Sequence, residues 1–296
     1  MEKIKVDLNI VPTQDSLDDM RSVVFSSKEV NDLLKDAKVN SQEIQQKLGV
    51  LFDFATDCEY CKHCPGLNNC MKNNPNLQTK IKIKNGLIES SLTPCKKYLE
   101  KISLDQKFLS RDFPLEWLDD SPKDIDQSEA RKKAFALFLK SLKKVNGNWI
   151  YLYGKERTGA SYLSAMMAII AANKNYYPIC YVNSKNEIDA LANLFYKDKS
   201  KFDDRIYSLF NCKLLVFDEF GTETKNNLVR DQIVLPILEY RKEKGLITIF
   251  NSETSIDKVA ISYMTSRAGE ENARKIKSIL KEKCQKEINL GEMSVY

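Results

Sequence analysis

The sequence predicts an α/β protein, in which a three-layer domain with a parallel sheet follows a small helical, cysteine-rich domain. Three observations support this prediction. In the second half of the chain, strand-like apolar runs alternate with helix-like stretches. One of those strands leads through a glycine-flanked loop into an apolar helix. Five of the eight cysteines lie between Cys58 and Cys95. Alternating strands and helices are typical of parallel sheets, and clustered cysteines indicate a metal site.

Length and composition exclude some classes of protein. The 296 residues are enough for two domains, and a net charge of +5 permits contact with nucleic acid without requiring it. No apolar run approaches the roughly 18 residues of a transmembrane helix, and residues 1–12 lack the apolar segment of a signal peptide. We therefore expect a cytoplasmic protein without a membrane partner, whose cysteines serve metal binding or packing rather than disulfides.

Residues 1–57 are predicted to be helical. A first helix begins near residues 16–19, and a second covers residues 27–37. Asn40 and Glu43 resemble the capping box of a third helix. Its apolar face at helical spacing consists of Ile44, Leu48, Leu51, Phe52 and Ala55. A small helical core is the simplest interpretation, and a docking surface for a partner is the alternative.

The cysteine cluster predicts a structural zinc site. Two-residue gaps let two thiolates face one ion, and a tetrahedral set of sulfur ligands suits zinc. Four sulfur ligands leave no open position for catalysis. Free thiols are the alternative interpretation. The predicted ligands are Cys61, Cys64, Cys70 and Cys95, with Cys58 and the single histidine, His63, in reserve.

A hairpin and a linker separate this cluster from the second domain. Residues 80–91 read as two strands around an Asn85-Gly86 turn, which brings Cys95 back to the other cysteines. The acidic, proline-containing stretch after the hairpin is typical of a linker. The predicted domains are residues 1–104 for the helical, zinc-binding part, 105–127 for the linker and 128–296 for the α/β part.

Residues 149–161 have the layout of a phosphate-binding loop. Residues 149–153 are aromatic and β-branched, as in a strand, and Gly154 and Gly159 flank the four residues that follow. Such a loop directs backbone N–H groups at an anion near the N-terminus of the next helix. An ordinary strand-turn-helix is the alternative. The candidate nucleotide-binding residues are Gly154, Lys155, Thr158, Gly159, Ala160, Ser161 and Tyr162.

The loop lacks the lysine of the G-x-x-x-x-G-K-[ST] consensus, because Ala160 occupies that position. Loss of one charge-assisted contact costs roughly 1.5–3 kcal/mol, or about ten- to hundredfold in affinity. Lys155 could supply the charge, although it lies on the other side of the turn. The sequence therefore leaves open whether the protein is an active ATPase.

The remaining elements complete the alternating pattern. Ser128 is a candidate N-cap for the helix that begins the second domain. The expected helices cover residues 129–145, 162–172, 187–196, 228–244 and 270–284, and the further strands cover residues 178–182, 213–217 and 246–250.

Polar residues follow two of these strands. Asp218 and Glu219 come directly after one strand, where Asp can hold magnesium and Glu can polarise water in phosphoryl transfer. Asn251 follows another strand and either orients water or the γ-phosphate, or caps a turn. Near the end of the chain, Arg267 and Arg274 are candidate arginine fingers for a neighbouring subunit in a ring, with a solvated basic face as the alternative.

Four segments occur in one order: CKHCPGLNNC, YLYGKERTGASYL, LLVFDEFGTE and YMTSRAGEENARKIKSIL. Together they resemble the bacterial primosomal helicase loaders, whose second domain is an AAA+ domain of the P-loop NTPase type. The resemblance covers nearly the whole chain. It implies that the helical, zinc-bearing part binds the hexameric replicative DNA helicase. It also implies that the AAA+ part binds ATP with Mg²⁺ and single-stranded DNA.

The resemblance also assigns roles to residues. Gly154, Gly159 and Ser161 match the phosphate loop, and Asp218 and Glu219 match the magnesium-binding and water-polarising pair.

Three positions depart from the family pattern: Ala160 replaces the lysine, Glu253 rather than Asn251 falls at the sensor position, and Ser278 stands where an arginine is expected. These departures suggest a loader that acts as a scaffold with weakened or lost ATP binding. One alternative is an active AAA+ ATPase that helps another DNA process, such as transposition. Another is a zinc-bearing nucleic-acid-binding scaffold. Self-association is a further expectation left open.

Overall fold

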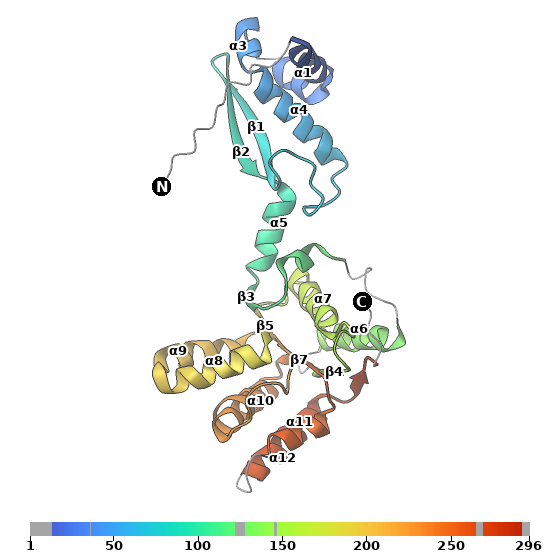
Figure 1. The fold of residues 1–296 in the computed structure, drawn as a ribbon, viewed down its shortest axis with the longest axis vertical. Helices are drawn as coiled ribbons and strands as arrows, with labels where there is room; N and C mark the ends of the chain where they lie inside the picture. The colour runs from blue at the N-terminus through green and yellow to red at the C-terminus, as the bar shows by residue number, and fades with distance from the viewer. Residues whose placement is uncertain (1–13, 36, 122–127, 145–146, 265–268, 292–296) are drawn as a thin grey trace. The chain divides into compact units, whose positions relative to one another are not determined.

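The computed structural model describes residues 14–35, 37–121, 128–144, 147–264 and 269–291 (Figure 1). The chain divides into two compact units, Met1–Lys101 and Ile102–Tyr296. Each unit has a hydrophobic core of its own, and each is described separately below.

In its described residues, the first unit packs four helices against a hairpin. The helices are α1 (Gln14–Ser26), α2 (Lys28–Lys35), α3 (Ser41–Gln46) and α4 (Leu48–Lys62). The antiparallel hairpin consists of β1 (Leu77–Lys84) and β2 (Leu87–Pro94), and α5 (Lys96–Asp105) follows it across the boundary of the units. The core consists of Val24, Val30, Leu48, Leu51, Ala55 and Ile88.

Two local predictions for this unit can be checked residue by residue. Asn85 and Gly86 form the hairpin turn with φ values of 52° and 78°, as an Asn-Gly turn requires. The Asn40 side chain accepts a 2.7 Å hydrogen bond from the backbone N–H of Glu43, which confirms half of the capping box. The Glu43 carboxylate instead accepts from the backbone N–H of Ile88 at 2.9 Å, and so joins α3 to the hairpin.

The second unit contains a six-stranded sheet in which the paired strands run parallel. Its order is β3 (Phe108–Arg111), β5 (Ile179–Asn183), β6 (Leu214–Asp218), β7 (Ile247–Ser252), β4 (Ile150–Tyr153) and β8 (Glu287–Asn289). The central strands are buried on both faces, as expected where helices cover both sides of a parallel sheet.

Helices cover both faces of this sheet and give the three layers that the sequence predicts. Figure 1 shows α6 (Glu129–Ser141) and α7 (Ala160–Asn173) on one face. The other face carries α8 (Ser184–Lys197), α9 (Lys199–Asn211), η3 (Val229–Val234), α10 (Leu235–Glu243), α11 (Ile256–Ser262) and α12 (Glu270–Lys283). Because side chains of successive strand residues point to opposite faces, residues such as Tyr151 and Leu152 enter different cores.

The structure differs from the sequence predictions in several elements. Strand β3 and the short helix η1 (Leu115–Asp119) lie within residues 105–127, which the sequence presents as a linker. Strand β8 and the helices α5, α9 and α11 are additional elements. The long helix expected over residues 228–244 begins as the π-helical turn η3. Ser128 occupies the N-cap position of α6, but its hydroxyl accepts a 3.0 Å hydrogen bond from Arg131 instead of capping the helix.

Candidate functional site

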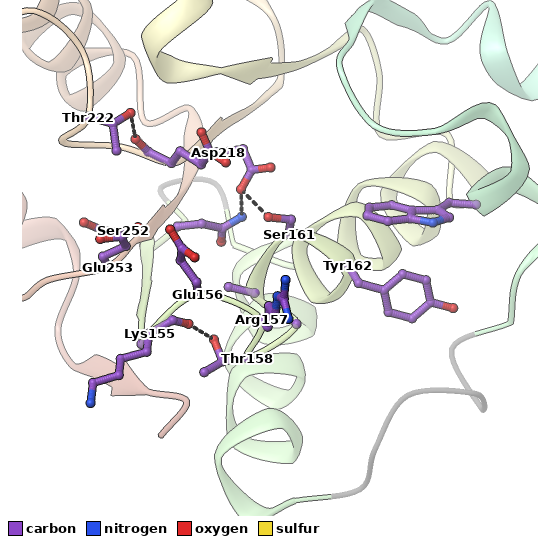
Figure 2. A pocket seen from close by; sticks show the side chains of 16 residues that line it. Lys155, Glu156, Arg157, Thr158, Ser161, Tyr162, Asp218, Thr222, Ser252 and Glu253 are labelled. Atoms are coloured by element: carbon purple, nitrogen blue, oxygen red, sulfur yellow. Dashed lines mark hydrogen bonds between the residues drawn. The ribbon is translucent and has the colours of Figure 1, made fainter. Parts of the chain in front are cut away.

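A cavity of about 550 Å³ lies at the carboxyl edge of the sheet, within the range of small-molecule sites (Figure 2). Its wall combines the phosphate-loop candidate with the tips of β6 and β7, as expected where parallel strands end. The lining residues are Trp117, Gly154, Lys155, Glu156, Arg157, Thr158, Gly159, Ala160, Ser161, Tyr162, Asp218, Glu219, Thr222, Asn251, Ser252 and Glu253.

The structure accounts for glycine at both ends of the loop. Gly159 precedes α7 with a φ of 75°, a conformation that glycine adopts without a steric penalty. A Cβ on Gly154 would lie 3.0 Å from the carbonyl oxygen of Gly291 and 3.1 Å from the hydroxyl of Thr158. A side chain at residue 154 would therefore require these neighbours to shift by a few tenths of an ångström. The loop takes the tight path that a phosphate-binding loop requires.

The loop is anchored from inside the protein. The buried Thr158 hydroxyl donates a 2.9 Å hydrogen bond to the carbonyl of Lys155. Arg131 of α6, only 6% exposed, donates to the carbonyl oxygen of Thr158 at 2.5 Å. Sequence analysis did not identify Arg131, because nothing in its local sequence distinguishes it from the other cations of α6.

The partly buried carboxylate of Asp218 connects the loop to the sheet. The Ser161 hydroxyl donates to Asp218 Oδ1 at 2.8 Å, and Asn251 Nδ2 donates to the same oxygen at 2.8 Å. The Tyr181 hydroxyl donates to Asp218 Oδ2 at 3.0 Å. Three residues predicted from different parts of the sequence thus meet at one point, and Tyr181 is an additional partner.

Burial raises the pKa of Asp218 above its ordinary value, and the negative charge of Glu219 acts in the same direction. Hydrogen bonds from Asn251, Ser161 and Tyr181 oppose this shift because they stabilise the ionised form. A serine hydroxyl beside an aspartate at the start of a phosphate-loop helix supplies the oxygen ligands that Mg²⁺ prefers.

Glu219 follows Asp218 and is held by a second strand tip. Its backbone has a φ of 56°, and its carboxylate accepts a 2.8 Å hydrogen bond from the side-chain amide of Asn183 at the end of β5. Residue pairing in the sheet places Asn183 opposite Asp218. Sequence analysis did not identify Asn183, and its place at the end of a predicted strand was the available signal.

The loop has no positive charge at the position of the consensus lysine. Ala160 is the first residue of α7 and lines the cavity without a charge. Lys155 also lines the cavity, but Figure 2 shows its side chain directed away from Ser161 and Asp218. The structure therefore does not bring Lys155 to the position that a consensus lysine would occupy.

Asn251 and Glu253 differ in their surroundings. Asn251 is 2% exposed and also donates to the Ser164 hydroxyl at 2.6 Å. Glu253 is exposed at the cavity wall. The resemblance to helicase loaders suggests Glu253 for the sensor position, whereas it is Asn251 that contacts the aspartate.

Of the two arginine-finger candidates, the structure describes only Arg274, and it does not line this cavity. Arg274 is exposed on α12 and forms a 2.6 Å ion pair with Glu270. It is absent from the described lining of the cavity. Arg267 lies outside the described residues. Ser278 is exposed on α12.

The predicted zinc ligands come from α4, the loop after it and the residue that precedes α5. All are partly buried free thiols. Burial raises the pKa of Cys61, and the neighbouring thiols Cys64 and Cys95 act in the same direction. The donor chemistry suits zinc, but no three His, Cys, Asp or Glu side chains among the described residues are arranged to hold a metal ion. The geometry thus does not support the predicted site of Cys61, Cys64, Cys70 and Cys95, or its reserves Cys58 and His63.

In the part of the chain that the structure describes, no helix has the length and apolar character needed to cross a bilayer.

The parallel sheet, the glycine-flanked loop at the start of α7 and the carboxylates at the tip of β6 together have the arrangement of an AAA+ type P-loop fold. No family model matches the chain. The chain is 24% identical over 268 residues to the replicative helicase loader DnaI of Bacillus subtilis (strain 168), covering 87% of this chain and 85% of the relative.

Solved structures agree with the fold. A crystal structure of DnaI has a TM-score of 0.54 at 22% identity, covering 65% of this chain and 99% of that chain. A putative primosome component from Streptococcus pyogenes serotype M3 has a TM-score of 0.50 at 20% identity, covering 66% and 98%. The resemblance to the helicase loader DnaI that the motifs indicated is thereby confirmed, together with the AAA+ fold.

Proposed function

We propose that the protein is a helicase loader of DNA replication that binds the hexameric replicative DNA helicase and single-stranded DNA, with weakened nucleotide binding. The observation that carries the proposal is the cavity in which Ser161 and Asp218 keep the arrangement of a P-loop domain while Ala160 provides no charge. The similarity to DnaI supports the loader role, since it extends over 87% of the chain.

The proposal assigns different tasks to the two units. The first unit, with α1–α4 and the hairpin, contacts the helicase. The second unit holds the nucleotide and single-stranded DNA, and self-association of this unit would place an arginine of one copy near the cavity of the next. All of these tasks are performed in the cytoplasm. A loader role explains the first unit better than a helper role in transposition, which gives that unit no evident task.

Nucleotide handling follows from the residues of the cavity. Backbone N–H groups at the start of α7 attract phosphate. The Ser161 hydroxyl and the Asp218 carboxylate are the residues that would hold Mg²⁺, which when bound neutralises phosphate charge. Without a lysine at residue 160, affinity is lower by about ten- to hundredfold. The Asn183 amide holds the Glu219 carboxylate, so Glu219 must leave this contact before it can orient water. These features favour a scaffold over a fast ATPase.

A structural zinc in the first unit is the part of the proposal that rests on cysteine spacing. Cys61, Cys64, Cys70 and Cys95 would hold it, and its role would be to fix the loop between α4 and β1.

Two measurements test the proposal separately. Size-exclusion chromatography with light scattering should show a stable complex of the full chain with the replicative helicase of the same organism. The absence of a complex at micromolar concentrations would contradict the loader role and favour the nucleic-acid-binding scaffold. Turnover of ATP with Mg²⁺ should be slow with and without single-stranded DNA. Robust turnover that Glu219→Gln abolishes would contradict the scaffold role. It would not bear on the proposed helicase interaction.

A further inference from the structure

The charges around the cavity do not match the anion that a phosphate loop binds. Six charged residues line it, and carboxylates outnumber cations: Glu156, Asp218, Glu219 and Glu253 against Lys155 and Arg157. The cation that would normally meet the β- and γ-phosphates is missing at residue 160. A nucleoside triphosphate therefore needs a positive charge from elsewhere in the loop.

Arg157 is placed to supply this charge. It lies between the two loop glycines, lines the cavity and is exposed. Figure 2 shows that the Lys155 side chain, the other cation of the loop, extends away from Ser161 and Asp218. Among the described residues, the Arg157 guanidinium has no hydrogen bond or ion pair that would hold it elsewhere.

Other arginines of the same unit are bound to the protein. Arg131 donates to Thr158 and Ser128, and Arg241 is surrounded by the carbonyl oxygens of Leu209, Cys212 and Ile247. These guanidinium groups support the structure and cannot turn to a ligand without breaking buried hydrogen bonds. Arg157 has no such constraint.

The backbone at Arg157 supports a functional interpretation. Its φ is 63°, in the left-handed region that few non-glycine residues occupy. A glycine would adopt this conformation without strain. Arginine at such a position raises the conformational energy of the loop, and strained backbone of this kind is concentrated at ligand-binding sites.

Arginine also has the chemistry that the site lacks. Its guanidinium remains charged, and its planar arrangement of donors matches phosphate oxygens in pairs. We propose that Arg157 contacts the phosphate chain of a bound nucleoside triphosphate and replaces, from the loop, the charge that is missing at Ala160. This inference rests on the nucleotide binding proposed above and identifies Arg157 as the residue that supplies the positive charge.

The test measures phosphate binding by titration calorimetry of the full chain. The probes are ATP with Mg²⁺ and inorganic tripolyphosphate, which has the phosphates without the base. Arg157→Ala should weaken both by tenfold or more, and Arg157→Lys should weaken them less. Arg157→Gly should lose affinity like the alanine variant while melting at a higher temperature, because glycine relieves the backbone strain. Lys174→Ala removes an exposed charge after the far end of α7 and should leave both affinities unchanged.

A double-mutant comparison tests the replacement directly. In an Ala160→Lys background, Arg157→Ala should weaken ATP binding by less than about threefold, because the new lysine makes the same contact. If Arg157→Ala stays within about twofold of the wild type, or if Lys155→Ala causes the loss instead, the inference is overturned and nucleotide binding stands. If the wild type binds neither probe at millimolar concentration, both the inference and the nucleotide part of the proposed function are overturned. The proposed helicase interaction is measured in a separate experiment and does not depend on this outcome.

Discussion

The side-chain amide of Asn251 and the hydroxyl of Ser161 donate hydrogen bonds to the same oxygen of Asp218, and both hydrogen bonds measure 2.8 Å. This single oxygen joins the tip of β7, the tip of β6 and the start of α7. The amide and the hydroxyl both favour the ionised carboxylate, whereas burial disfavours it. The balance between these effects sets the charge of the site.

The first prediction concerns the pH dependence of stability. Burial raises the pKa of Asp218 above the ordinary value of 3.8, so the folded state binds this proton more tightly than the unfolded state. The contribution of Asp218 to stability therefore falls as pH rises from the ordinary pKa to the raised one, and is constant above it. Over that interval, the unfolding free energy of the wild type should fall relative to that of Asp218→Asn, because the variant has no carboxyl group at this position to titrate.

Urea unfolding between about pH 4 and about pH 8 measures this difference. The altered hydrogen bonds of the variant add a pH-independent offset, so the slope is the relevant quantity. Asp204→Asn, on an exposed position of α9, serves as the control. A difference between Asp218→Asn and wild type that stays constant with pH would contradict the assignment.

The second prediction concerns Asn251. Asn251→Ala removes the donors to Asp218 and Ser164 and leaves a partly buried carboxylate with one hydrogen bond fewer. We expect a loss of about 1–3 kcal/mol in unfolding free energy at neutral pH and a smaller loss at acidic pH. Asn193→Ala, an exposed change on α8, is the matched control in the same urea titration. A loss below about 0.5 kcal/mol would show that Asn251 is dispensable.

The third prediction concerns the missing lysine. In an Arg157→Ala background, Ala160→Lys should raise the affinity for ATP with Mg²⁺ by about ten- to hundredfold, because a charge-assisted contact to phosphate is restored, and the gain should be smaller where Arg157 is present. Ala160→Met adds a similar length of side chain without the charge and should not raise the affinity. Calorimetric titration compares the two variants. Equal affinities would mean that the loop cannot present a lysine to phosphate.

The parts of the fold that were predictable from sequence have strong local signals. Asn85-Gly86 determines its turn by backbone preference, and long apolar runs determine the central strands. The edge strands β3 and β8 have four and three residues, too few for periodicity to distinguish them from loops. Edge strands also rely on the sheet for their pairing, and the sheet is formed by residues distant in sequence.

The candidate site likewise contains residues that the sequence predicts and residues that it does not. Asp218 and Asn251 follow strands that were predictable, so their meeting at one edge could be anticipated. The partners Asn183 and Tyr181 depend on β5 lying beside β6, which is a matter of strand order. Arg131 depends on where α6 packs against the loop. Strand order and the packing of α6 leave no local signal in the sequence, whereas the position of Asn183 directly after a predicted strand does.

The fourth prediction concerns metal in the first unit. If Cys61, Cys64, Cys70 and Cys95 hold structural zinc, the purified protein carries one zinc ion per chain, and Cys61→Ser loses it together with thermal stability. Cys58→Ser should retain the ion. Elemental analysis of both variants and of the wild type measures the metal directly. A metal-free wild type with all five thiols of the cluster reactive would show that the cysteines do not form a zinc site.

The last prediction concerns the support of the phosphate loop by α6. Arg131 donates to the Thr158 carbonyl at 2.5 Å, and its guanidinium is buried. Arg131→Met keeps the apolar stem and removes the donors, so Thr158 loses a charge-assisted partner. We expect a loss of about 1.5–3 kcal/mol in unfolding free energy.

Hydrogen exchange distinguishes local loosening from general destabilisation. In Arg131→Met, the amides of residues 154–159 should exchange faster, and this increase should exceed that of the central strands. Lys132→Met changes a neighbouring exposed cation of α6, whose ion pair with Glu129 spans 3.6 Å, and should change stability by less than about 0.5 kcal/mol. If exchange in the loop rises no more than in β6, Arg131 stabilises the unit as a whole and does not position the loop. If the loop alone loosens, the path of its backbone depends on a guanidinium that no phosphate-loop consensus includes.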